Sequence, residues 1–85
     1  MRRRSRADVI TDVLVEALDG AAKTKIMYRC NLNLLRFERY FGELLAKGLI
    51  VVVENPGSNT TLYMTTKKGR ALLEILKEAK QIVSL

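Results

Sequence analysis

The first part of the chain repeats apolar residues at helical spacing. From Arg6 to Asp19 apolar residues recur every three or four positions and acidic residues occupy the other side, which predicts an amphipathic helix. Ser5 and Asp8 are spaced as in a capping box, and Gly20 is a suitable helix end. The apolar positions are Val9, Ile10, Val13, Leu14, Ala17 and Leu18.

Two further helices are predicted on either side of an asparagine-rich break. Thr24 is the expected N-cap of a short helix that ends at Cys30, and Asn33 is the expected N-cap of a helix over Leu34–Lys47. The short break between them is typical of a helix-turn-helix. The expected buried positions are Ile26, Met27 and Cys30, then Leu34, Phe37, Phe41, Leu44 and Leu45.

The hydrophobic pattern changes after Gly48. The β-branched run Leu49–Glu54 predicts a strand, Asn55–Asn59 a turn with Pro-Gly at its centre, and Thr60–Thr65 the returning strand of a hairpin. Thr66 is then the expected N-cap of a last helix over residues 67–83. This order of elements predicts a mainly α fold with a small β-hairpin, the winged helix-turn-helix.

The apolar positions of the last helix cover a wide arc and recur at close to heptad spacing. One face can pack on the first helix while another meets a second copy of the chain. We therefore expect residues 1–66 to form the winged helix-turn-helix domain with a basic N-terminal arm, and residues 67–85 to form a dimerisation helix. The alternative is that one face of the helix packs back onto the first helix of the same chain and no second copy is involved. The positions concerned are Leu72, Ile75, Leu76, Ala79, Ile82 and Val83.

Charge and length narrow the function. The 85 residues suffice for one domain, and 15 Lys and Arg against 9 Asp and Glu give a formal charge of +6. This excess favours a polyanion, with nucleic acid ahead of an anionic membrane surface. The longest apolar run, Leu49–Val53, is far too short to cross a bilayer.

One cysteine and no histidine restrict the chemistry. Cys30 has no partner for an internal disulfide, and we expect a small core hydrophobe rather than a redox sensor. Without histidine, a His-dependent triad is impossible and no usual transition-metal site remains. We expect a cytoplasmic, nucleoid-associated protein that is not an enzyme and uses no cofactor, metal or small-molecule substrate.

Three stretches resemble a known family: KTKIMYRCNL (Lys23–Leu32), FERYFGELLAKGLI (Phe37–Ile50) and YMTTKKGRALLE (Tyr63–Glu74). They are similar to small archaeal winged-helix DNA-binding proteins of the ten-kilodalton chromatin type. The first stretch is the more family-specific, while parts of the other two occur in many winged helices. The resemblance runs from about residue 4 to 83 and implies DNA binding and dimerisation through the C-terminal helix.

The chain departs from these proteins at two places. Thr65 stands where they usually carry a leucine before the cap of the last helix. The last helix is also shorter than the long antiparallel coiled coil known in the family.

Arginines on the third predicted helix are the main candidates for DNA contact. Arg36 and Arg39 lie on its outer face and can contact guanine or phosphate. The alternative is a solvated face on which both arginines pair with Glu43. The flanking candidates are Asn33, Leu35 and Tyr40.

Other candidates surround this helix. Lys23, Lys25 and Arg29 belong to a stretch without carboxylates, from Gly20 to Phe37, and are expected to contact phosphates. The arginine cluster at the N-terminus is either an arm along DNA or a solubilising tail. Its members are Arg2, Arg3, Arg4 and Arg6. Ser58 and Asn59 at the wing tip give a weaker signal, because the tip has no Lys or Arg.

These observations leave two classes of function. The first is binding of double-stranded DNA by a homodimer, as a transcription regulator or a chromatin-shaping protein. The second is a protein-interaction module in a larger assembly without DNA contact. A membrane-surface role is disfavoured, because the basic residues do not line one strongly amphipathic helix.

Overall fold

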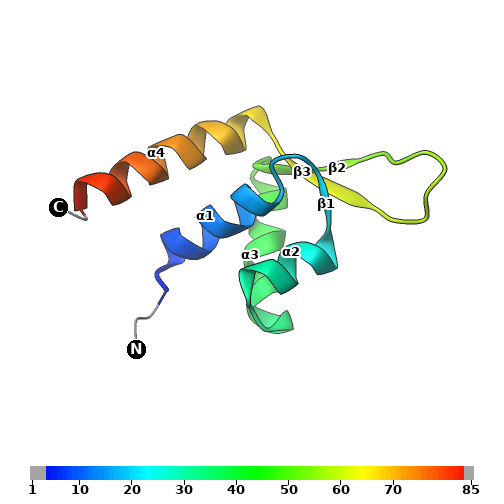
Figure 1. Ribbon diagram of the computed structural model, residues 1–85, viewed down its shortest axis with the longest axis horizontal. Helices are drawn as coiled ribbons and strands as arrows, with labels where there is room; N and C mark the ends of the chain where they lie inside the picture. Colours follow the sequence, from blue (N-terminus) through cyan, green and yellow to red (C-terminus); the bar gives the residue numbers. More distant parts are fainter. Residues whose placement is uncertain (1–3, 84–85) are drawn as a thin grey trace.

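The computed structural model describes residues 4–83 and confirms the mainly α winged-helix fold. Figure 1 shows α1, α2 and α3 as the body, the hairpin β2–β3 as a wing at one end, and α4 running beside α1 towards the other end. No helix in this part of the chain is long and apolar enough to cross a membrane. The elements are α1 (Arg6–Glu16), β1 (Ala21–Ala22), α2 (Lys23–Cys30), α3 (Leu34–Ala46), β2 (Ile50–Val53), β3 (Leu62–Thr65) and α4 (Lys67–Val83).

Apolar residues from all four helices meet in one core. The Phe37 and Phe41 rings of α3 stack with centroids 4.9 Å apart. Cys30 is buried as expected, and this burial raises the pKa of its thiol to about 11. The other buried side chains include Val9, Val13, Leu14, Ile26, Leu44 and Leu73.

The prediction that Leu34 belongs to the core is wrong. Leu34 is 63% exposed, although its spacing matches that of the buried phenylalanines. It lies in the first turn of α3, which extends past the rest of the body, so that little of the chain covers it. A helix face can therefore be apolar without being buried where the helix end has no neighbour.

The first helix is shorter than its apolar pattern predicts. The capping box of Ser5 and Asp8 is confirmed, but α1 ends at Glu16 instead of Asp19. The carbonyl oxygen of Ala17 accepts from the N–H groups of Gly20 and Thr65, at 3.2 and 2.9 Å. These bonds turn the chain out of the helix and towards the sheet.

The sheet has a third strand that the sequence pattern does not indicate. Ala21 and Ala22 form β1 and pair antiparallel with Tyr63 and Leu62 of β3, giving the strand order β1-β3-β2. The start of α2 shifts accordingly. Ala22 is its N-cap, without a side-chain hydrogen bond, so the predicted cap at Thr24 is wrong.

The hairpin is confirmed with shorter strands than predicted. β2 and β3 pair from Ile50↔Thr65 to Val53↔Leu62. In the loop, Ser58 N–H donates to the Asn55 carbonyl at 3.1 Å, and Gly57 has φ +82°, as a type II turn requires at its third position.

The wing is joined to the helices by two threonines. Thr65 is buried, and its hydroxyl donates to the Leu14 carbonyl at 2.7 Å, so this buried polar side chain has a hydrogen-bond partner. Thr66 caps α4, because its hydroxyl accepts from Gly69 N–H at 3.0 Å. The same hydroxyl donates to the Gly48 carbonyl at 2.7 Å.

Lysines at the start of α4 oppose its dipole, and the fold supplies a compensating contact for one of them. Lys68 Nζ donates to the carbonyl oxygen of Lys47 at 2.9 Å, at the C-terminal end of α3. A cation is favourable at that end. Lys68 therefore connects α4 to α3.

Candidate nucleic-acid interface

The turn between α2 and α3 sets the position of the candidate DNA-reading helix. Asn31 adopts the left-handed conformation, with φ +54°, directly after α2. Asn33 Oδ1 accepts from Arg36 N–H at 2.9 Å and caps α3. Asparagine tolerates the left-handed conformation better than most residues, and it is also a preferred N-cap residue. The side chain of Asn33, expected to flank a DNA contact, is thus engaged in positioning α3.

Arg36 and Arg39 are exposed on α3. Within residues 4–83, no carboxylate oxygen lies within 4.0 Å of either guanidinium. Glu43, their alternative partner, instead pairs with Arg6 and, at 3.2 Å, with Lys47. Lys47 and Arg6 hold the pKa of the Glu43 carboxyl below its usual range. The two arginines therefore remain available to an external anion.

The outermost line of α3 is defined by geometry. With 100° per residue, positions 35, 39, 42 and 46 point away from the buried Phe37, Phe41 and Leu44. These positions carry Leu35, Arg39, Gly42 and Ala46, and all four are exposed. The hydrophobic pattern does not single out Gly42 and Ala46, although their spacing from Leu35 places them on this line.

Cations of α2 divide into two groups. Lys25 and Arg29 are exposed, and no ion pair joins either of them to another residue in the described part of the chain. Lys23 instead pairs with Glu38 of α3 at 2.7 Å and lies 5.5 Å from the centre of the Phe41 ring. Lys23 therefore joins the two helices of the helix-turn-helix.

The described part of the N-terminal arm is held against the domain. Arg4 donates to the Cys30 carbonyl and to Asp12. Arg6, which begins α1, pairs with Glu43 and lies 5.5 Å from the centre of the half-buried Tyr40 ring. A free arm is thus not what the structure shows for these two arginines. Arg2 and Arg3 lie outside the described residues.

The wing tip has exposed polar side chains. Ser58 and Asn59 are exposed, and Ser58 Oγ accepts from Thr60 N–H at 3.1 Å. Figure 1 shows the tip at the opposite end of the molecule from the C-terminus.

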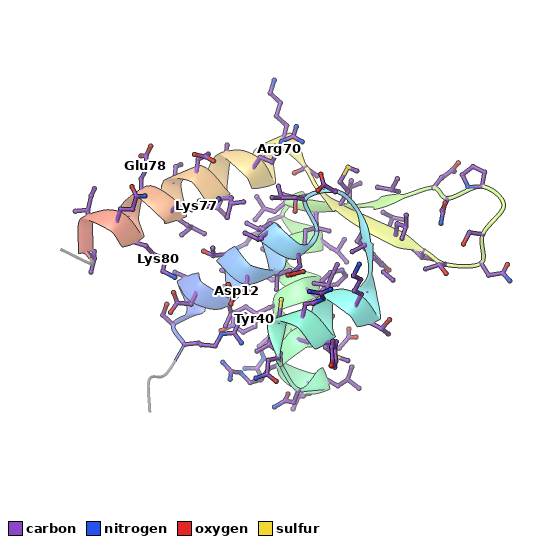
Figure 2. All side chains as sticks on the ribbon, in the orientation of Figure 1. Asp12, Tyr40, Arg70, Lys77, Glu78 and Lys80 are labelled. Atoms are coloured by element: carbon purple, nitrogen blue, oxygen red, sulfur yellow. The ribbon has the colours of Figure 1, made fainter. Side chains whose placement is uncertain are left out.

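The predicted dimerisation residues fall into two sets. Leu72 and Leu76 are half-buried, and Leu72 packs against the core beside the buried Leu73. Lys80 reaches across to Asp8 of α1 at 2.7 Å, and Figure 2 shows its side chain directed towards that helix. The other four are exposed: Ile75, Ala79, Ile82 and Val83.

Comparison with known proteins places this geometry in a family. No curated protein sequence is significantly similar to the chain. The structure is similar to Sso10a-2, a DNA-binding protein from Sulfolobus solfataricus, with a TM-score of 0.82 and 20% identity over 95% of this chain and 83% of that one.

Two larger regulators share the fold. The transcriptional repressor CouR, bound to a 23-mer DNA duplex, gives a TM-score of 0.71 and 25% identity over 93% of this chain and 56% of CouR. MarR from E. coli, complexed with operator DNA, gives 0.67 and 19% over 87% of this chain and 52% of MarR. The chain spans about half the length of these regulators. A family model described as winged helix-turn-helix matches residues 3–84, and the chain belongs to that family.

Proposed function

We propose that the protein binds double-stranded DNA through α3, as a transcription regulator or a chromatin-shaping protein of the nucleoid. The observation that carries the proposal is the exposure of Arg36 and Arg39 on α3 with no carboxylate of residues 4–83 within 4.0 Å. An arginine so placed can donate two hydrogen bonds to guanine O6 and N7, or pair with a phosphate. The major groove is wide enough to admit one helix.

Basic side chains outside α3 support the proposed DNA-binding surface. Lys25 and Arg29 are exposed on α2, which a short turn joins to α3. In this proposal they would contact phosphates. Lys23, Arg4 and Arg6 act differently in this proposal, because their ion pairs fix α2, α1 and α3 relative to one another. They would position the interface instead of touching DNA.

We also infer that two copies pair through the exposed edge of α4. Ile75, Ala79 and Ile82 recur at close to heptad spacing on this edge and are not covered by the domain. In Figure 1, α4 lies on the other side of the body from the first turn of α3. Pairing would therefore leave both copies of α3 accessible, and two linked sites raise affinity through effective concentration.

A second function is favoured by a specific observation. Tyr28, Leu34 and Leu35 are 82%, 63% and 76% exposed, and they stand close together in sequence, near the end of α2 and at the start of α3. Exposed apolar side chains that lie together are typical of protein interfaces. A protein-interaction module would use these side chains in place of the arginines.

Fluorescence anisotropy separates the two functions. Wild type is titrated with random and genomic duplexes over a series of salt concentrations, beside Arg36→Ala/Arg39→Ala and a matched control, Arg70→Ala/Lys77→Ala. The control removes the same charge from exposed positions of α4. DNA binding through α3 predicts a steep fall of affinity with salt, at least a tenfold loss in the α3 variant and little loss in the control. Equal losses in both variants, or no binding by wild type at low salt, would reject it.

A further inference from the structure

One leucine lies on the surface that would face DNA. Leu35 is 76% exposed and follows the N-cap of α3 by two residues. Arg39 lies one turn later on the same outermost line, and Arg36 lies beside it. A single exposed leucine is ordinary on a protein surface. Here it stands on the same exposed side of α3 as two arginines that have no ion pair within residues 4–83, so a ligand that binds both arginines can also contact the leucine.

The adjacent Leu34 provides a contrast. It lines a small cavity with Met27 and Phe37 between α2 and α3, although most of its side chain is exposed. Leu35 is absent from the lining of that cavity and points 100° further round the helix. Leu34 and Leu35 have similar exposure, but Leu35 alone lies on the outermost line of α3 that a ligand bound to Arg39 would meet.

Gly42 leaves room for a ligand to approach this line closely. A glycine inside a helix costs about 1 kcal/mol relative to alanine. The fold does not require it, because nothing lies within 4 Å of a Cβ added at Gly42. Ala46, one turn further on, is also small. With no bulk at these two positions, the α3 backbone can come close to a ligand, and Leu35 and Arg39 are the longer side chains that reach it.

We propose that Leu35 reads the C5-methyl group of a thymine in the major groove. A leucine side chain can neither donate nor accept a hydrogen bond, and the thymine methyl is the apolar group that base edges present in that groove. Arg39 lies four residues on, about 6 Å along the helix axis, so the thymine would lie within about two base pairs of the Arg39 contact. This inference rests on the proposed function and names the base feature that α3 prefers.

The test removes only the methyl group. The tightest-binding duplex of a genomic panel is resynthesised with deoxyuridine in place of thymidine, which preserves base pairing. Affinities of wild type, Leu35→Ala and the control Leu34→Ala are measured for both duplexes by fluorescence anisotropy, after circular dichroism has shown that the variants fold. Burial of one methyl group corresponds to about a fourfold change in affinity.

The proposal predicts that wild type and Leu34→Ala lose about fourfold on the deoxyuridine duplex, whereas Leu35→Ala binds both duplexes equally. Two results would overturn it while leaving DNA binding intact. One is equal binding of both duplexes by wild type. The other is a loss of affinity on the deoxyuridine duplex that is as large for Leu35→Ala as for wild type, which would assign the effect to DNA shape or to another residue. Absence of binding to any duplex would reject the proposed function as well, and Leu35 would then belong to a protein interface.

Discussion

Lys80 Nζ of α4 lies 2.7 Å from Asp8 Oδ1 of α1, so one ion pair joins the last part of the chain to its first helix. Asp8 also accepts from Ser5 N–H at 3.0 Å in the capping box. The hydrogen bonds from Lys80 and Ser5 hold the pKa of the Asp8 carboxyl well below its usual range. This carboxylate therefore serves both the start of α1 and the position of α4.

The first prediction concerns pH. Because the pKa of Asp8 is lower in the folded protein than in the unfolded chain, the stabilisation is complete well above the ordinary pKa of 3.8 and is lost progressively as the pH falls through that value and below it. Asp8→Asn should lower the melting temperature at pH 7, and this difference from wild type should shrink steadily between pH 5 and pH 2. The exposed Asp19→Asn serves as the control and should change little. A difference independent of pH would show that the charge of Asp8 is not what stabilises the fold.

Two helical glycines should respond to alanine with opposite signs. At Gly42 the added Cβ meets nothing within 4 Å, so the free energy of unfolding should rise by about 1 kcal/mol. At Gly69 the Cβ would lie 2.2 Å from the Leu49 carbonyl oxygen and 2.7 Å from Thr65 Cγ2, so the free energy of unfolding should fall by about 1–3 kcal/mol. Urea denaturation of both variants measures these changes. Destabilisation by Gly42→Ala would show that packing requires this glycine.

The hydroxyl group of Thr65 should contribute measurably to the free energy of unfolding. Thr65→Val keeps the shape of the side chain but removes the donor to the Leu14 carbonyl oxygen, in a buried place. Loss of a buried hydrogen-bond partner costs about 1–3 kcal/mol. Urea denaturation should show this loss for Thr65→Val and almost none for Thr61→Val, which changes an exposed residue. Equal effects of the two substitutions would contradict the role given to this hydrogen bond.

Pairing through α4 predicts the oligomeric state of the protein in solution. Ile75 and Ile82 are 62% and 71% exposed, so glutamate at both positions should leave the fold intact and place charge in the proposed contact. Sedimentation equilibrium should find a dimer for wild type and a monomer for Ile75→Glu/Ile82→Glu. The exposed Lys77→Glu is the control, and it should remain dimeric. A monomeric wild type would remove this part of the proposal.

Most of the helical framework could be predicted from local signals in the sequence. The capping box of Ser5 and Asp8, the cap at Asn33 and the start of α4 at Lys67 all depend on contacts within one turn of a helix. Such contacts leave a recognisable spacing of residues. The wing turn around Gly57 could be predicted for the same reason.

What could not be predicted depends on partners distant in sequence. Two alanines carry no strand signal, and β1 exists because Ala21 and Ala22 meet β3 across the fold. The ion pair of Arg6 with Glu43, separated by 37 residues, likewise converts an expected DNA contact into a link between α1 and α3. The exposure of Leu34 follows from where α3 extends beyond its neighbours, which its periodicity does not reveal.

The contact surface itself can be mapped by NMR. A ¹⁵N-labelled sample is titrated with a short duplex at low salt, and amide shifts are followed for wild type and for Arg36→Ala/Arg39→Ala. DNA binding through α3 predicts that the largest shifts fall on residues 35–42 of α3 and 25–29 of α2, and that they are strongly reduced in the double variant. Shifts concentrated on α4 or on the wing, with those of α3 unchanged, would show that another surface binds DNA.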